Sequence, residues 1–314
     1  MRRTTSLLIG LSALLNLGIW GAFGPTDIAL ASLSVMTTTS DLEAIVREIG
    51  GSDVATGAFC KGTQDPHFLE PKPSYMVKAN RADLVVAIGL GLEVGWLPSI
   101  VQGARNPKIA PGQPGYLEVG PLIKPLEVPE GKVTRAQGDV HPEGNPHATL
   151  DPIRVGEMAV AIAKRLGELD PPHASTFSTR ADELVKRLAE KTKGWQSRID
   201  RTGVKKIITF HKTLTYFFNR FHLENPAILE PLPGIPPTVR HTLDVIQRAK
   251  ADKVSLILVE NFFDSSAGER VAKDVPGMRV ATVPVAVGGS DDVKSIDDLF
   301  ERLVKAIEGK GSNG

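Results

Sequence analysis

Two histidines lie close together in a segment that is rich in proline, glycine and asparagine. Residues 139–152 read DVHPEGNPHATLDP, and the histidines are His141 and His147. Proline and glycine at this density exclude a regular helix, so both histidines are expected on a braced loop. Imidazoles held on such a loop are typical of metal ligands, but one loop seldom supplies a whole coordination sphere. The remaining ligands must therefore come from other parts of the chain.

Two further histidines share this context. His67 lies in QDPHFLEP after a probable strand at residues 54–59, and His211 directly follows the apolar run KIITF at residues 206–210. In doubly wound α/β lobes, ligands gather at the carboxyl ends of the strands. We therefore predict that His67, His147 and His211 meet in a cleft between two lobes.

A fourth ligand is needed to complete a tetrahedral zinc site. Neutral imidazole suits zinc, and three imidazoles leave room for one carboxylate or a water molecule. Glu260 is the first choice because it ends the buried run VSLILVE. Asp291 and Asp292, in a glycine-rich loop, are the second choice. Two roles stay open for His141, which could be a residue of the cleft or an alternate ligand.

Other polar residues receive a structural interpretation. A histidine in a loop is more often a surface or hydrogen-bonding residue than a ligand, and we keep that interpretation for His173, His222 and His241. Glu260 itself could equally cap the next helix or pair with a base. Cys60 is the only cysteine of the chain, so no internal disulfide forms, and a small buried side chain is its expected role.

Strands and helices must position these residues. Apolar runs at Leu33–Thr37 and residues 84–88 predict buried strands, and residues 93–102 predict a helix. Residues 106–137 carry many prolines and glycines and are expected to form an irregular surface excursion. This alternation of strands and helices favours an α/β lobe with a mainly parallel sheet.

A long amphipathic stretch follows at residues 173–200. A helix of this length would measure about 40 Å at 1.5 Å per residue and would act as a stiff strut between lobes. Beyond it, strands are predicted at 206–210, 227–232 and 254–259. The predicted fold class is α/β, with two Rossmann-like lobes of mainly parallel sheets joined by one long rigid helix. The predicted boundaries are 1–31 for a signal peptide, 32–170 for the N-terminal lobe, 171–203 for the linking helix and 204–314 for the C-terminal lobe.

The first residues resemble a secretory signal. Arg2 and Arg3 precede an apolar run at residues 7–23, and Ala29-Leu30-Ala31 fits a cleavage pattern, so we predict export and cleavage after Ala31. An uncleaved membrane anchor is the rival interpretation. The net charge of +1, from 37 basic and 36 acidic residues, argues against a nucleic-acid partner.

Three motifs in order carry a family resemblance. DPHFLEP at 65–71, GNPHATLDP at 144–152 and FHKTLTYF at 210–217 resemble the zinc- and manganese-binding solute receptors of bacterial ABC importers, the ZnuA/TroA-like group. The segment EPLPGIPPTVRHTLDVIQRAK at 230–250 is also similar to the second lobe of that family. The resemblance covers essentially the whole chain after the predicted signal peptide.

This resemblance implies one metal ion held between two lobes by His67, His147 and His211, with Asp65 and Asn145 orienting the ligand loops. Manganese receptors often have a glutamate at the third position, so histidine here favours zinc. The chain also departs from the family. Thr149 replaces a common aromatic residue, residues 106–137 hold no histidine-rich loop, and VPVAVGG at 283–289 lacks the usual acidic fourth ligand.

The leading hypothesis is a monomeric periplasmic receptor that delivers Zn²⁺, or alternatively Mn²⁺ or Fe²⁺, to the permease of an ABC importer. Binding needs neutral histidines, so affinity should fall below a pH of about 6. A secreted zinc hydrolase is the second hypothesis, although the chain has no HExxH motif. The third is a surface adhesin or structural protein in which the metal only stabilises the fold.

Overall fold

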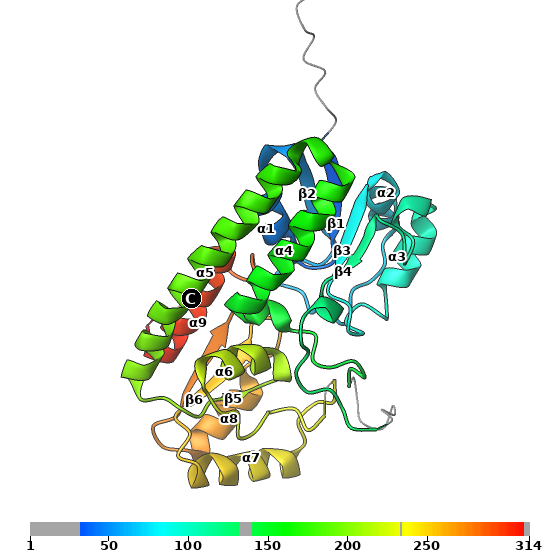
Figure 1. Ribbon diagram of the computed structural model, residues 1–314. Helices are drawn as coiled ribbons and strands as arrows, with labels where there is room; N and C mark the ends of the chain where they lie inside the picture. Colours follow the sequence, from blue (N-terminus) through cyan, green and yellow to red (C-terminus); the bar gives the residue numbers. More distant parts are fainter. Residues whose placement is uncertain (1–31, 132–139, 233, 311–314) are drawn as a thin grey trace, which may run out of the picture. The chain divides into compact units, whose positions relative to one another are not determined.

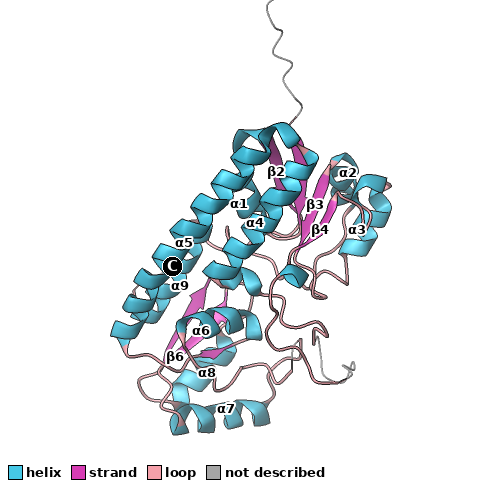
Figure 2. Ribbon diagram, viewed as in Figure 1, coloured by secondary structure: helices cyan, strands magenta, loops and turns pink. Residues whose placement is uncertain are grey.

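The computed structural model describes residues 32–131, 140–232 and 234–310. The predicted signal peptide and part of the predicted surface excursion lie outside the described residues. The described residues from Ser32 onward belong to one compact unit. Within this unit, two parallel sheets are flanked by helices (Figures 1 and 2). The α/β prediction with mainly parallel sheets is therefore confirmed.

The first sheet has four parallel strands in the order β2-β1-β3-β4. They are β1 (Leu33–Thr37), β2 (Val54–Ala58), β3 (Leu84–Ala87) and β4 (Tyr116–Glu118). The accompanying helices are α1 (Ser40–Gly50), α2 (Pro73–Arg81), α3 (Leu97–Ala104) and α4 (Pro152–Leu169). β3 is buried along its whole length, as its unbroken apolar run predicts.

The second sheet has three parallel strands in the order β5-β6-β7. They are β5 (Ile208–Thr209), β6 (Leu256–Glu260) and β7 (Arg279–Val283). The helices of this part are α6 (Thr215–Phe221), α7 (Val239–Ala251), α8 (Ser266–Asp274) and α9 (Ile296–Glu308). In Figure 1, α7 and α8 lie at the far end of this part, away from the first sheet.

The predicted strut is α5 (Ala174–Thr202), a helix of 29 residues. It lies beside α4 on one stretch and beside α9 on another (Figure 1). Arg187 pairs with Glu48 of α1 and with Asp297 of α9, while Arg198 pairs with two glutamates of α9. The helix is therefore fixed to the elements of both sheets.

One hydrophobic core extends through both parts. It contains Val35 and Leu84 of the first sheet, Leu258 of the second, and Phe300 of α9. Trp195 of α5 packs on Phe300 with ring centroids 5.2 Å apart. Burial of this apolar surface opposes a wide separation of the two sheets.

Three sequence predictions need correction. Helix α3 begins at Leu97 rather than at residue 93, because the buried Glu93 carboxylate accepts hydrogen bonds from the backbone N–H groups of Ile88 (2.8 Å) and Gly89 (3.0 Å). The irregular excursion contains strand β4, which extends the first sheet. Residues 227–232 are not a strand and form only two isolated bridges, Ile228 with Thr209 and Leu232 with Ile235.

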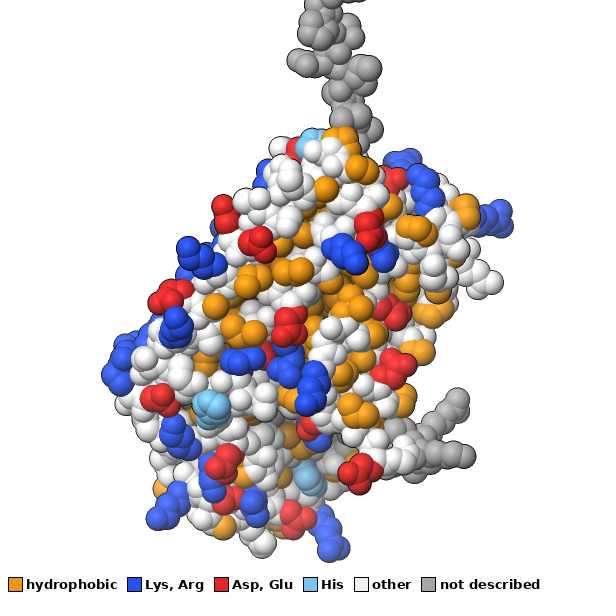
Figure 3. All heavy atoms as spheres, in the orientation of Figure 1, with side chains coloured by type: hydrophobic (Ala, Val, Ile, Leu, Met, Phe, Trp, Pro, Cys, Tyr) orange, Lys and Arg blue, Asp and Glu red, His pale blue; other side chains and the backbone are white. Residues whose placement is uncertain are grey.

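Surface features bear on the class of partner. On the face drawn in Figure 3, Lys and Arg side chains alternate with Asp and Glu, in line with the net charge near zero. Among the described residues, no helix combines the length and the apolar character needed to cross a membrane.

Candidate metal centre

Three histidines from distant parts of the chain meet at one point. One ring nitrogen each of His67, His147 and His211 lies within 4.8 Å of the other two. The ring centroids are 5.2 to 5.5 Å apart. His67 comes from the loop after β2, His147 from the loop before α4, and His211 lies two residues after the end of β5. The structure therefore brings together the three histidines that the sequence singles out.

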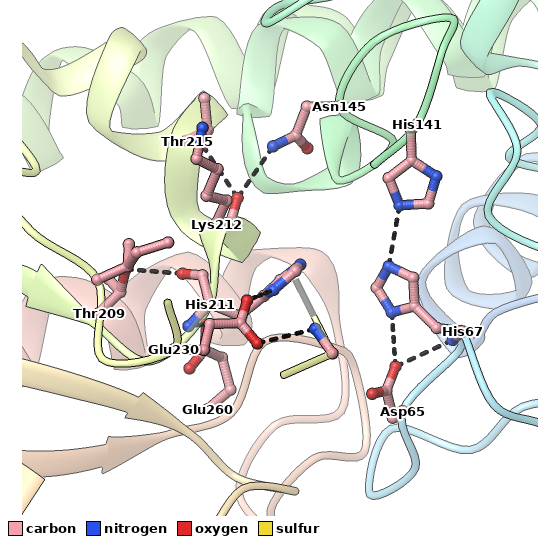
Figure 4. Close-up of polar contacts among 12 residues, drawn as sticks. Asp65, His67, His141, Asn145, Thr209, His211, Lys212, Thr215, Glu230 and Glu260 are labelled. Atoms are coloured by element: carbon pink, nitrogen blue, oxygen red, sulfur yellow. Dashed lines mark hydrogen bonds and ion pairs between the residues drawn. The ribbon is translucent and has the colours of Figure 1, made fainter. Parts of the chain in front are cut away.

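His67 is oriented by Asp65, two residues earlier on the same loop. Asp65 Oδ1 accepts hydrogen bonds from the backbone N–H of His67 (2.9 Å) and from ring nitrogen Nδ1 (2.7 Å), as Figure 4 shows. Burial raises the pKa of the Asp65 carboxyl, but the bonds from His67 outweigh it and the net pKa is lowered. The ionised carboxylate fixes the proton on Nδ1 and leaves Nε2 free to bind a metal ion.

His211 is held by a buried acid that the sequence prediction missed. Its Nδ1 pairs with Oε1 of Glu230, whose other oxygen accepts a hydrogen bond from the backbone N–H of Gly234 (3.1 Å; Figure 4). Burial lowers the pKa of His211, but the contact with Glu230 raises it and the net pKa is above its ordinary value. Glu230 follows the apolar residues 227–229, the same signal that made Glu260 a candidate.

His147 is buried, like His211. Asn145 Oδ1 accepts a hydrogen bond from the backbone N–H of His147 (3.0 Å), and Asn145 Nδ2 donates to the carbonyl of Lys212 (3.0 Å). Nε2 of His147 is buried and has no hydrogen-bond partner among the described residues. Burial and the neighbouring histidines hold its pKa well below the ordinary value. A neutral, unpartnered imidazole nitrogen is a ready metal ligand.

The His147 loop is also fixed to the second part of the fold. Asp151, which caps α4, accepts two hydrogen bonds from the Arg220 guanidinium of α6, at 2.8 and 2.9 Å. Together with the bond from Asn145 to Lys212, these contacts join the loop of one ligand to the segment that follows another. Two of the three histidines are thereby positioned relative to each other before any metal arrives.

The predicted carboxylate ligands lie outside the three-histidine cluster. Glu260 is completely buried at the end of β6, where Oε1 accepts a hydrogen bond from the backbone N–H of His211 (3.3 Å). Burial raises the pKa of Glu260 to about 7. Asp291 and Asp292 are exposed, and Asp292 accepts a hydrogen bond from the Ser290 hydroxyl (2.7 Å).

A fourth histidine borders the cluster. Nε2 of His141 lies 3.2 Å from Nε2 of His67 (Figure 4). A cleft of about 370 Å³ is lined by His141, His147 and His211 together with Asn145 and Lys212. Burial and the neighbouring histidines lower the pKa of His141 to about 4. His141 therefore lies in the cleft, directly beside one predicted ligand.

The other histidines and Cys60 are not part of the three-histidine cluster. Nδ1 of His173 pairs with Asp170 at 2.7 Å, and Nε2 of His241 bonds the carbonyl of Ile228 at 3.0 Å. His222 ends α6 in a left-handed conformation. Cys60 is buried, and burial raises the pKa of its thiol to about 12, so the unreactive thiol form dominates.

The donor set determines the chemistry of the site. Imidazole nitrogens suit Zn²⁺ and other divalent transition metals better than Ca²⁺ or Mg²⁺, which prefer oxygen. Nδ1 of His67 and Nδ1 of His211 are each paired with a carboxylate, the usual support for metal-binding histidines.

Comparisons with known proteins point in the same direction. The model of the family described as "Zinc-uptake complex component A periplasmic" matches residues 35–309. The manganese ABC transporter substrate-binding lipoprotein of Streptococcus gordonii is 25% identical over 292 residues, which cover 90% of this chain and 91% of that protein. The iron-binding protein YfeA of Yersinia pestis is 24% identical over 273 residues, covering 85% and 81%. A crystal structure of ZnuA superposes with a TM-score of 0.75 at 22% identity, covering 90% of this chain and 100% of that one.

Proposed function

This chain belongs to the family of periplasmic zinc-uptake components, the metal-binding receptors of ABC importers, and from that membership we propose that it captures Zn²⁺ and delivers it to a membrane permease. The ion would be held by His67, His147 and His211. The observation that carries the proposal is the approach of three ring nitrogens to within 4.8 Å. The family consists of receptors rather than enzymes, so the hydrolase hypothesis is abandoned.

The preference for zinc is the finer part of the proposal. Relatives are named for manganese and for iron as well as zinc, so family membership alone does not choose the metal. Three imidazoles from this chain support zinc, because manganese sites favour oxygen ligands. The same receptor role for Mn²⁺ or Fe²⁺ is the second candidate. For the fourth position, the sequence favours Glu260, while the cleft also offers His141.

The remaining expectations are proposals of the same kind. We propose a monomer that works on the outer side of the cytoplasmic membrane after removal of residues 1–31. We also propose that residues 32–170 and 204–314 act as two lobes on either side of the segment 171–203. Attachment of α5 to α1 and α9 supports small tilts rather than wide closure during metal capture.

A competition titration tests the function. Metal-free protein comprising residues 32–314 would be titrated with Zn²⁺ and with Mn²⁺ against a chromophoric chelator. We expect tight 1:1 zinc binding, weak manganese binding, and a loss of several orders of magnitude in zinc affinity for His147→Ala and for His211→Ala. His173→Ala, which removes a histidine paired with Asp170, is the matched control. Near-normal zinc affinity in both ligand variants would refute the assignment, and stronger binding of manganese would change the cargo.

A further inference from the structure

We propose that His141 is the fourth metal ligand, so that the ion is held by four imidazoles instead of three imidazoles and a carboxylate. This inference rests on the proposed function, because it completes the coordination of the same ion. It replaces Glu260, the fourth ligand predicted from the sequence.

The distance between two ring nitrogens carries the argument. Nε2 of His141 and Nε2 of His67 are 3.2 Å apart. Two nitrogens bound to one tetrahedral zinc ion, each with a bond of about 2.0–2.1 Å, are separated by roughly 3.3 Å. The two rings therefore already have the spacing that a shared zinc ion would impose.

The far sides of both rings indicate which nitrogens are free. Nδ1 of His67 is bonded to Asp65. Nδ1 of His141 lies against Gly91, 3.4 Å from the position of a Cβ there. When Nδ1 carries the proton in both rings, the two Nε2 lone pairs face each other at 3.2 Å. That pairing is repulsive unless a cation lies between them.

The loop that carries His141 is closely packed rather than free. Gly144 donates a backbone hydrogen bond to the carbonyl of His141 (3.2 Å), which closes a turn. Gly144 has a φ of +111° and its Cα faces Pro125, so that a Cβ there would lie 2.7 Å from the Pro125 side chain. The next residue, Asn145, donates to the carbonyl of Leu126 at 2.8 Å. The turn holds His141 at the cleft within six residues of His147.

Glu260 is placed less favourably for the same role. Its Oε1 accepts a hydrogen bond from the backbone N–H of His211, its Oε2 is buried without a hydrogen-bond partner among the described residues, and the side chain has no exposed surface. Neither Glu260 nor His141 belongs to the group whose ligand atoms all lie within 4.8 Å of one another. His141, in contrast, lines the same cleft as His147 and His211. A set of four neutral nitrogens would also favour zinc over manganese more strongly than a set that includes a carboxylate.

Zinc K-edge X-ray absorption on the 1:1 zinc complex tests this inference, because it counts the imidazoles bound to the ion. Wild-type protein should show four imidazoles, and both His141→Ala and the bulkier His141→Gln should show three with a 10- to 100-fold loss of zinc affinity. Glu260→Gln should keep four. His241→Ala is the matched control, since it removes a histidine bonded to a carbonyl outside the cluster.

The outcomes separate the two proposals. Tight 1:1 zinc binding with three imidazoles and one oxygen, unchanged by loss of His141, would overturn the role of His141 and leave the receptor function intact. Loss of the oxygen ligand in Glu260→Gln would then return the fourth position to Glu260. Failure of the wild-type protein to bind zinc tightly would instead refute the proposed function itself.

Discussion

The backbone N–H of Val287 donates a hydrogen bond of 2.7 Å to Oδ1 of Asp41, although the two residues are 246 positions apart in the chain. The other carboxylate oxygen, Oδ2, accepts a hydrogen bond of 2.9 Å from the hydroxyl of Thr149. Asp41 thus joins α1, the loop after His147 and the segment after β7. The hydroxyl of Thr149 completes this junction.

Asp41 makes stability depend on pH. Burial raises its pKa to about 6, against 3.8 for the free group, although bonds from Val287 and Thr149 lower it. Between these values the folded protein binds more protons than the unfolded chain, so the contribution of Asp41 to stability increases as the pH falls from about 6 to 4.

Replacing Asp41 by Asn should remove this dependence. The amide can accept from Val287 and donate to Thr149, so both bonds survive while the buried charge is lost. We expect the Asp41→Asn substitution to increase the free energy of unfolding of the metal-free protein, relative to wild type, by more at pH 7.5 than at pH 4.5. The two increases should differ by on the order of 2 kcal/mol. Urea unfolding at both pH values measures this difference, with the exposed Asp291→Asn as the control. If the substitution changed the free energy of unfolding by the same amount at both pH values, the role of Asp41 would be contradicted.

Glu230 should tune the metal site through His211. Glu230→Gln removes the charge that holds the Nδ1 proton of His211, so the imidazole becomes a weaker base and a less firmly oriented ligand. We expect zinc affinity at pH 8 to fall by about 10- to 100-fold, as measured by chelator competition. Glu190→Gln on the exposed face of α5 is the control. Unchanged affinity in Glu230→Gln would show that Glu230 serves the fold alone.

The pH dependence of zinc binding should follow His211. Because the pKa of His211 is raised, protons begin to compete with zinc for this residue at a pH above 6.5, the ordinary pKa of histidine. The pKa of His147 is lowered, so protons do not compete for that residue in the same pH range. Zinc affinity should therefore decrease about tenfold per pH unit once the pH falls below the pKa of His211. The sequence alone predicted a decrease only below about pH 6. Affinity that stays constant down to pH 6 would contradict the raised pKa.

Residues of the shared core should determine the stability of the protein but not its affinity for zinc. Phe300 is completely buried and packs on Trp195 and on Phe217. Phe300→Ala should lower the free energy of unfolding by about 3–5 kcal/mol. Zinc affinity of the folded fraction should stay within a factor of about three, because none of these rings contacts the histidine cluster. Denaturant unfolding and chelator titration of the same preparation check both statements.

Much of the fold follows from local patterns. Strands such as Leu33–Thr37 and the long helix α5 are set by apolar periodicity, which reads directly from the sequence. The start of α3 does not follow from apolar periodicity, because the Glu93 side chain points inward and accepts hydrogen bonds from backbone N–H groups just after β3. Strand β4 is only three residues long and sits among prolines and glycines, so its pairing depends on the sheet beside it.

The histidine cluster was accessible to sequence reasoning because each member follows a strand or lies in a braced loop. The supporting acid Glu230 was not, since its role depends on a contact across 19 residues with His211. Sequence spacing also could not decide whether Glu260 or His141 is the better candidate for the fourth ligand. Both lie in suitable positions along the chain, and only the direction of each side chain distinguishes them.

The continuous core and the anchored helix α5 have a practical consequence for reporter design. If metal capture involves only the small tilts proposed above, a sensor made by attaching fluorescent proteins to the two ends of the described chain would report metal binding poorly, because the ends would hardly change their separation. A small environment-sensitive dye beside the cleft would respond better. Phe68 offers such a position: its side chain is 67% exposed and its ring lies 6.1 Å from that of His67.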